Sequence, residues 1–203
     1  MNKTYLFILF FWGVLSSNLI AQDKLLFLNG KELDGSILNQ TEYEITFKDK
    51  KEKEIVVDNY RLFSITKNNQ ETILYKYDTL EGNFLKEHDM KMFVYGEREA
   101  YRSYSSNFSN ALGLAAGGVA GYFMHKDQSF IYVATPLVYT TLTLPFGTSV
   151  KHKKLSSSEY LKEDEFLRGY ERVARSKRTQ NALKSSVLGV GLGFLTSLIV
   201  NGN

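Results

Sequence analysis

The sequence contains no cysteine among its 203 residues. The protein therefore has no disulfide, no thiol nucleophile and no cysteine-ligated metal. The formal net charge of +3 is too small to predict nucleic-acid binding, which usually requires many Lys and Arg on one surface. The P-loop, HExxH and GxSxG motifs are absent as well. We therefore expect no catalytic residues, no metal site and no cofactor, and we predict that the chain is not an enzyme.

Residues 1–21 have the layout of a secretory signal peptide. Lys3 forms a basic start, residues 5–15 are apolar, and the segment ends at Ala21. The apolar run is shorter than the ~20 residues that span a bilayer, which favours cleavage next to Ala21 over an uncleaved anchor. In either case we expect the remainder of the chain to be exported.

Two short stretches resemble proteins of the bacterial envelope. The "AQ" at residues 21–22 resembles the end of signal peptides in Bacteroidota envelope proteins. The stretch "GYERVARSKRTQNALKSSVLGVGLG" at 169–193 is similar to the C-terminal part of uncharacterised Bacteroidota envelope proteins. The resemblance implies a location in the bacterial cell envelope and implies no activity.

Residues 22–80 have the pattern of a small β-domain. Short runs rich in β-branched residues, such as "YEITF" and "EIVV", alternate with turn residues. Asn29-Gly30 predicts a type I′ hairpin turn, in which both residues need positive φ. We predict five or six strands that form a small antiparallel β-barrel or sandwich of SH3-like or Sm-like size. With the helices that follow, the fold class is α+β.

Residues 84–105 change to helical spacing. Leu85, Met92, Phe93 and Ala100 fall on one apolar stripe, which predicts an amphipathic helix that links the β-domain to the rest. Gly96 indicates a break within this helix.

Residues 109–147 predict a hydrophobic hairpin. Its first arm is uncharged, and its second arm contains Pro136 and Pro145, which a soluble helix tolerates poorly and a membrane helix can accommodate. Both arms are short for full spanning, so a re-entrant or tilted hairpin is an open alternative.

The last part of the chain predicts a basic amphipathic helix over 156–181 and a membrane helix over 182–200. The basic residues can attract an anionic lipid surface or can fix the orientation in the membrane, and both interpretations stay open. They are Arg168, Arg172, Arg175, Lys177, Arg178 and Lys184.

Small residues recur at every fourth position in two segments. Residues four apart share one ridge of a helix, and small ridges let helix backbones approach closely in lipid. We predict that these two ladders pack helices together, within one chain or between copies. They are Ser109, Gly113, Gly117 and Gly121 in the first segment, and Ser185, Gly189, Gly193 and Ser197 in the second. A faint repeat of "NAL" before each ladder indicates either a duplication or two similar helices of independent origin.

These patterns together predict a non-enzymatic envelope membrane protein with a structural or interaction role. The expected partners are membrane lipid and an envelope protein or a second copy, and no nucleic acid. A periplasmic β-domain and an inner-membrane location are favoured, because helices rather than closed barrels span that membrane. The alternative is a small oligomeric pore or transport accessory in which Thr140, Thr141 and Thr143 line a polar path.

Overall fold

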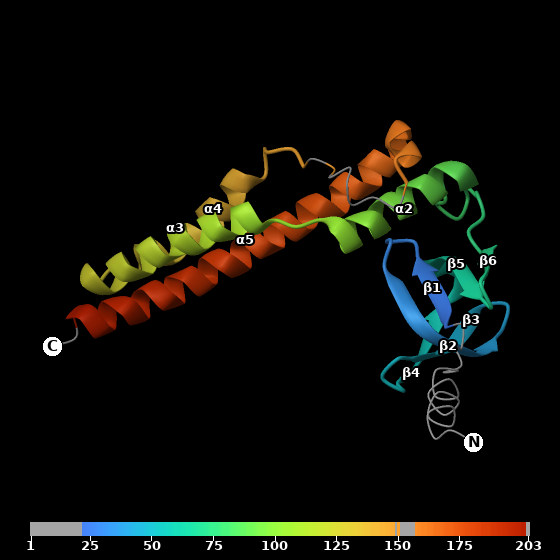
Figure 1. Ribbon diagram of the computed structural model, residues 1–203, viewed down its shortest axis with the longest axis horizontal. Helices are drawn as coiled ribbons and strands as arrows, with labels where there is room; N and C mark the ends of the chain where they lie inside the picture. The colour runs from blue at the N-terminus through green and yellow to red at the C-terminus, as the bar shows by residue number, and fades with distance from the viewer. Residues whose placement is uncertain (1–21, 149, 151–156, 202–203) are drawn as a thin grey trace, which may run out of the picture. The chain divides into compact units, whose positions relative to one another are not determined.

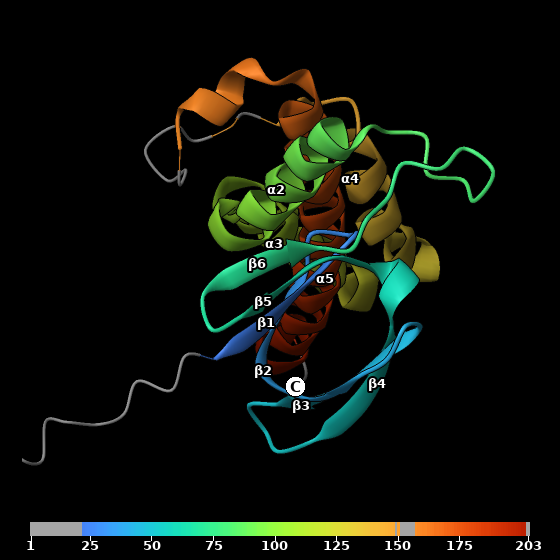
Figure 2. The ribbon, with the colours of Figure 1, turned by 90° about the vertical axis from the view of Figure 1, so that its right-hand side faces the viewer.

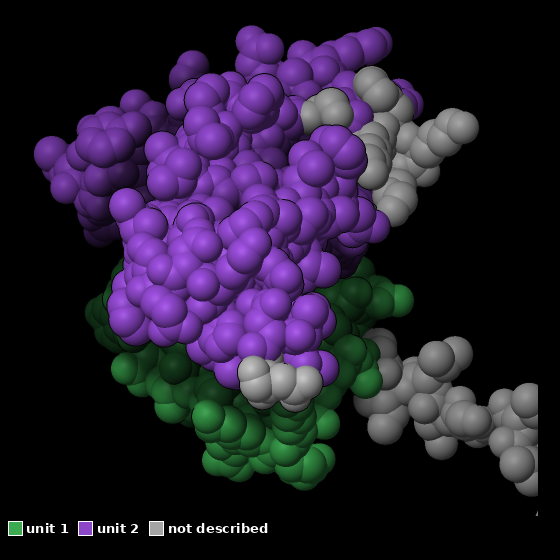
Figure 3. All heavy atoms as spheres, turned by 90° about the vertical axis from the view of Figure 1, so that its left-hand side faces the viewer, with its two compact units in different colours: residues 1–26, 33–74 green, residues 27–32, 75–203 purple. Residues whose placement is uncertain are grey.

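The computed structural model describes residues 22–148, 150 and 157–201. The predicted signal peptide lies outside the described residues, as does the predicted start of the basic helix at residue 156. The chain forms two compact units, which Figure 3 distinguishes by colour. Within the described residues, unit 1 comprises 22–26 and 33–74, and unit 2 comprises 27–32 and the chain from residue 75 onward.

Six strands form an antiparallel open sheet with the order β4-β3-β2-β1-β5-β6. The strands are β1 (Asp23–Phe27), β2 (Glu32–Gln40), β3 (Glu44–Asp49), β4 (Glu54–Asp58), β5 (Leu62–Lys67) and β6 (Gln70–Ile73), and a short 3-10 turn, η1 (Asn59–Arg61), joins β4 to β5. The predicted α+β class and antiparallel strands are confirmed, and the strands form an open sheet instead of the predicted small barrel or sandwich. The sheet curves (Figure 2), yet β4 and β6 remain as edges.

The buried residues of unit 1 alternate along β3, whereas β5 buries consecutive residues such as Leu62 and Phe63. Ile45 and Phe47 are fully buried and are separated by one residue, as the period of a strand requires. Gly35 is paired with Asp49 across β2 and β3. A Cβ at Gly35 would overlap the Lys48 carbonyl and press on the Phe47 ring, so only glycine fits there.

The turn between β1 and β2 differs from the predicted type. Of the pair Asn29-Gly30, Gly30 alone has positive φ, at 70°. The Gly30 amide donates to the Phe27 carbonyl at 3.0 Å, and the Phe27 amide donates to the Lys31 carbonyl at 2.9 Å. This is a three-residue loop with glycine in the left-handed region, so the hairpin is present and the type I′ assignment is wrong.

Unit 2 is built around one long helix (Figure 1). The helices are α2 (Glu87–Ser103), α3 (Asn107–Lys126), α4 (Thr135–Thr143) and α5 (Asp164–Asn201), with 3-10 turns η2 (Phe130–Ala134) and η4 (Glu159–Lys162). The predicted basic helix and membrane helix are two halves of the single 38-residue α5. The helix begins at Asp164 rather than at residue 156, because η4 precedes it.

α2 and α3 lie one after the other along α5 and run parallel to it. Gly96 of α2 contacts Phe166 near the start of α5, and Gly121 of α3 contacts Val190 near its end. Contacts therefore advance in the same direction along both partners. α4 returns toward the start of α3, since the Tyr139 hydroxyl and that of Ser109 lie 3.3 Å apart.

Two expectations about helix breakers are corrected by the structure. α2 continues through Gly96, because a Cβ there would overlap the Phe166 carbonyl and glycine permits this close approach. Pro136 lies in the first turn of α4, and Pro145 follows the end of that helix. Proline needs no amide hydrogen at either place, so the two prolines delimit a short helix and do not kink a long one.

Candidate functional site

The two predicted ladders meet each other within one chain. We use the name glycine seam for Gly113, Gly117 and Gly121 of α3 with Gly189 and Gly193 of α5. All five are buried. A Cβ at Gly117 would overlap the Ser186 carbonyl, and one at Gly193 would overlap the Gly118 carbonyl. The absence of side chains therefore permits direct contact between the two helix backbones.

The contacts across the seam are reciprocal. Gly121 contacts the carbonyl of Val190, three residues before Gly193, and Gly193 contacts the carbonyl of Gly118, three residues before Gly121. The same relation joins α2 to the start of α5, where Gly96 contacts Phe166 and Gly169 contacts Phe93. The helices α2 and α3 on one side and α5 on the other thus pack with approximate twofold symmetry. Any two parallel helices that pack through matching glycines have this symmetry, so both interpretations of the sequence repeat stay open.

Of the serines in the ladders, Ser185 and Ser197 contact the facing helix of the seam, and Ser109 does not. Ser109 accepts, through its backbone carbonyl, a hydrogen bond from the Tyr139 hydroxyl, so it contacts α4 rather than α5. The Ser185 hydroxyl donates to the Ala182 carbonyl at 3.1 Å, and a Cβ at Gly113 would overlap this hydroxyl, so Ser185 faces α3. Ser197 is fully buried, and its hydroxyl lies 3.0 Å from Nδ1 of His125.

Large apolar side chains cover the outside of these same helices. Ile199 is 85% exposed and Ile131 is 76% exposed. Many other apolar residues of α3, η2, α4 and the second half of α5 are also exposed, including Phe108, Val119, Phe130, Leu137, Leu142, Val187, Leu188 and Leu195. Small residues thus lie inside and large apolar residues outside, which is the reverse of a water-soluble bundle.

Among the helices that the structure describes, α5 is the one long and apolar enough to cross a membrane. Only 22% of its apolar window is buried within the protein, whereas the core helix of a soluble protein would be mostly buried. α4 with η2 forms a shorter apolar stretch over Phe130–Thr143.

The six basic residues do not form one surface. Arg168 and Arg175 pair with Glu165 at 2.6 Å and Glu171 at 2.7 Å on their own helix. The Lys177 ammonium donates to carbonyls at the end of α2, including that of Tyr101 at 3.0 Å, and burial lowers the pKa of this amine. Lys184 is exposed. The other two are Arg172, which contacts a buried acid, and Arg178, which is itself buried.

A buried acid lies between α2 and α5. Glu97 is fully buried, and its Oε1 is 3.2 Å from Nε of Arg172, but neither carboxylate oxygen accepts a hydrogen bond from a described residue. Burial raises the pKa of Glu97 to about 7, and the Arg172 guanidinium opposes part of that rise. Glu97 is therefore close to the midpoint of its titration at neutral pH.

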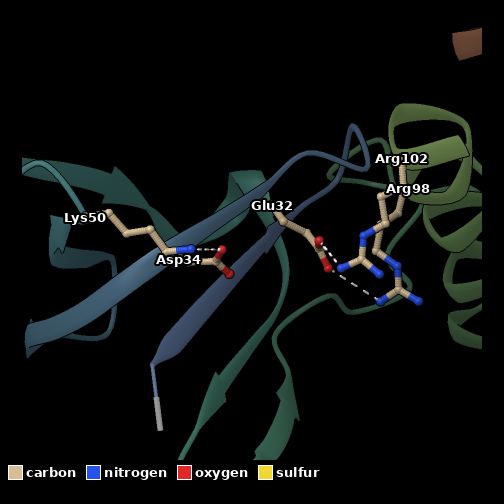
Figure 4. A network of polar contacts seen from close by, with 5 residues as sticks. All are labelled: Glu32, Asp34, Lys50, Arg98 and Arg102. Carbon is tan, nitrogen blue, oxygen red and sulfur yellow. Dashed lines mark hydrogen bonds and ion pairs between the residues drawn. The ribbon is translucent and has the colours of Figure 1, made fainter. Parts of the chain in front are cut away.

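The turn at residues 27–32 packs on the same helix. A Cβ at Gly30 would overlap that of Glu97, so the turn backbone contacts α2 directly. Glu32 pairs with Arg98 at 3.7 Å and with Arg102, and Figure 4 shows both arginines reaching toward this carboxylate. Sequence reasoning missed this cluster. The spacing of Phe93 and Glu97, four residues apart, places the acid on the predicted apolar stripe and was the available signal.

The threonines of α4 use their hydroxyls locally. Thr140 donates to the Pro136 carbonyl at 2.7 Å, and Thr141 donates to that of Leu137 at 2.9 Å. Thr143 donates to the carbonyl of Thr140. Such bonds within one helix leave these hydroxyls poorly suited to line a polar path, so no observation here favours a pore.

Within the described parts of the chain, no group of three or more His, Asp or Glu side chains is placed to hold a metal ion. No family model, curated protein or solved structure matches this sequence or fold.

Proposed function

We propose that this chain is a non-enzymatic membrane protein of a bacterial envelope, with a structural or interaction role. Its helical unit is anchored in lipid, and its sheet binds an envelope partner. The observation that carries the proposal is the reversed polarity of α3, α4 and the second half of α5. Glycines are buried at the seam, while residues such as Leu137 and Ile199 are exposed. In water this apolar surface would favour aggregation, whereas lipid solvates it.

The helix lengths fit a bilayer. α3 has 20 residues, a length similar to that of the apolar half of α5 and equal to roughly 30 Å of helix. α3 is less apolar than a helix that crosses a membrane alone, and it packs through the glycine seam along α5, which is apolar enough to cross. α3 and α5 are parallel, so the chain must return to the starting side of the membrane before α5 begins. The segment that returns consists of η2 and α4, which follow α3 in the sequence. Tyr132 of η2 lies beside Phe123 near the end of α3, and Tyr139 of α4 contacts Ser109 near its start. In this proposal the chain crosses the layer with α3, returns through it with η2 and α4, and crosses again with the apolar half of α5.

This arrangement determines which soluble parts share a side. α2 precedes α3, and the polar half of α5 packs along α2 through Gly96 and Gly169. The polar half of α5 therefore lies on the same side as α2 and as the sheet that precedes α2 in the chain. With an exported N-terminal part, this side is the periplasm. Basic residues such as Arg172 then serve helix packing rather than the positive-inside tendency.

Single cysteines test this topology, because the natural chain has none. Three exposed positions suit this test: Lys53 in the β3–β4 turn, Lys126 at the end of α3 and Ser158 before η4. We expect Lys53→Cys and Ser158→Cys to react in intact cells with a thiol reagent that crosses the outer but not the inner membrane. Lys126→Cys should react only after the inner membrane is permeabilised.

Two results would contradict the proposal. Reaction of all three cysteines in intact cells, together with extraction of the protein by alkaline carbonate, would show that the helices do not cross the membrane. Reaction of Lys53→Cys alone would place an odd number of crossings between the sheet and η4, which the parallel pair does not allow.

A further inference from the structure

A cavity of about 400 Å³ lies between α3, α4 and α5 in unit 2. Its size is within the ~300–1,000 Å³ range of small-molecule sites. Aliphatic and aromatic side chains form most of its wall, and one charged side chain reaches it. The principal lining residues are Phe108, Leu112, Tyr139, Leu142, Phe146 and Arg178.

Arg178 is the exceptional residue of this cavity. It is only 7% exposed, and its Nη1 donates to the Gly147 carbonyl at 3.0 Å while Nη2 donates to the Phe146 carbonyl. A guanidinium has five N–H donors, and Nε of Arg178 has no partner among the described residues. Donor capacity therefore remains on a buried cation.

The positive charge of Arg178 is also unbalanced. The ion pairs found among the described residues do not include it, and the sequence contains no acidic residue between Asp127 and Glu159. A buried charge is costly unless an opposite charge or several hydrogen bonds compensate it. An anion at this position would supply both.

We propose that the cavity binds one anionic phospholipid, with an acyl chain against the apolar wall and the phosphate at Arg178. This inference rests on the proposed membrane anchoring, which puts Arg178 at the level where α5 changes from polar to apolar residues. That level is the headgroup region of a bilayer. Arginine suits phosphate because its planar donors match phosphate oxygens and the group stays charged.

Lipid binding in detergent tests the inference on the full chain. The protein, purified in a neutral detergent, is mixed with phosphatidylglycerol or phosphatidylcholine, and native mass spectrometry counts the lipids retained. We expect one retained phosphatidylglycerol, at least tenfold preferred over phosphatidylcholine. Arg178→Gln should lose this preference. Lys184→Gln, which removes an exposed charge outside the cavity wall, should keep it.

A second pair of variants keeps the test decisive if Arg178→Gln does not fold. Leu142 is 62% exposed and lines the cavity, whereas Val133 is 55% exposed and does not line it. Leu142→Trp fills the space and should abolish retention of phosphatidylglycerol, and Val133→Trp should not. Because both residues are on the surface, both variants should fold.

Three outcomes would overturn the inference. They are equal retention of the two lipids by the natural chain, unchanged retention after Leu142→Trp, and displacement of phosphatidylglycerol by millimolar inorganic phosphate. The last would indicate a site for free phosphate rather than for a lipid. Alkaline carbonate extraction of the same natural chain separates the two proposals. A protein that stays in the membrane without a lipid preference refutes only the lipid site.

Discussion

Gly117 and Gly189 contact each other's helices in the same way. Gly117 touches the carbonyl of Ser186, three residues before Gly189, and Gly189 touches the carbonyl of Leu114, three residues before Gly117. Each glycine thus provides the space for the other helix. Such mutual contact makes α3 and α5 a single packed pair, and it uses the ladder faces within one chain. Association between copies would therefore need a different surface.

Gly193→Ala should destabilise the helical unit. The added Cβ would overlap the Gly118 carbonyl, so the helices must separate locally, which we expect to cost about 1–3 kcal/mol as in other overpacked cores. Thermal unfolding in detergent, followed by circular dichroism, measures the loss. Gly191 provides the matched control, because it is on the same helix and a Cβ there meets nothing within 4 Å. Gly191→Ala should be neutral or slightly stabilising. Equal melting temperatures for the two variants would refute close packing at the seam.

Glu97→Gln should change how stability depends on pH. The carboxyl has a folded pKa of about 7, above its ordinary value of 4.5. Between these pH values the folded state holds a proton that the unfolded state has released. The free energy of unfolding should therefore fall as pH rises from 4.5 to 7, and then level off. The amide that replaces the carboxyl does not titrate, so the variant should lack this fall and gain about 3 kcal/mol relative to the natural chain at about pH 8.5.

The measurement is the melting temperature of both proteins at several pH values from about 4 to 9. Glu97→Asp serves as the control, because it keeps a carboxyl and should keep a pH dependence in this range. A natural chain whose stability rises over the same range would contradict the raised pKa.

Gly30→Ala should lower the free energy of unfolding by more than the backbone strain of alanine at positive φ accounts for. Gly30 has φ 70°, where alanine is strained, and its Cβ would also overlap that of Glu97. Gly82 has φ 85° with nothing within 4 Å of an added Cβ, so Gly82→Ala measures the strain by itself. We expect about 1 kcal/mol for Gly82→Ala and at least about 1 kcal/mol more for Gly30→Ala. Denaturant unfolding compares them, and equal losses would show that the turn does not press on α2.

The sequence predicted the type of most helices and strands, but it did not predict that the last two helices are one continuous helix, α5. The change of period after residue 80 correctly indicated where strands give way to helices. It could not show that α5 is continuous, because the polar pattern before Ala182 and the apolar pattern after it differ in composition although both are helical. The open sheet was not predicted either. Closure depends on pairing between the edge strands, and the pattern of a single strand does not record which strand lies beside it.

The candidate site was predictable where it depends on spacing alone. A small residue at every fourth position implies a groove on any helix, and the structure brings the two grooves together. The cavity at Arg178 was not predictable, because its wall comes from three helices and its charge imbalance depends on which arginines find partners. Arg172 and Arg178 look alike in the sequence, yet one faces Glu97 and the other faces carbonyls.

Arg172→Gln should destabilise the protein in alkaline rather than in acidic solution. Arg172 is the cation beside Glu97, at 3.2 Å, and its guanidinium also lies over the Phe93 ring. At about pH 5 the Glu97 carboxyl is protonated, so the variant loses only the ring contact. At about pH 9 the carboxylate is charged and buried, and loss of the half-exposed cation should cost a further ~1–2 kcal/mol. Melting temperatures at the two pH values measure this difference. In a Glu97→Gln background the effect of Arg172→Gln should be the same at both pH values, and a persistent difference would mean that another group titrates beside Arg172.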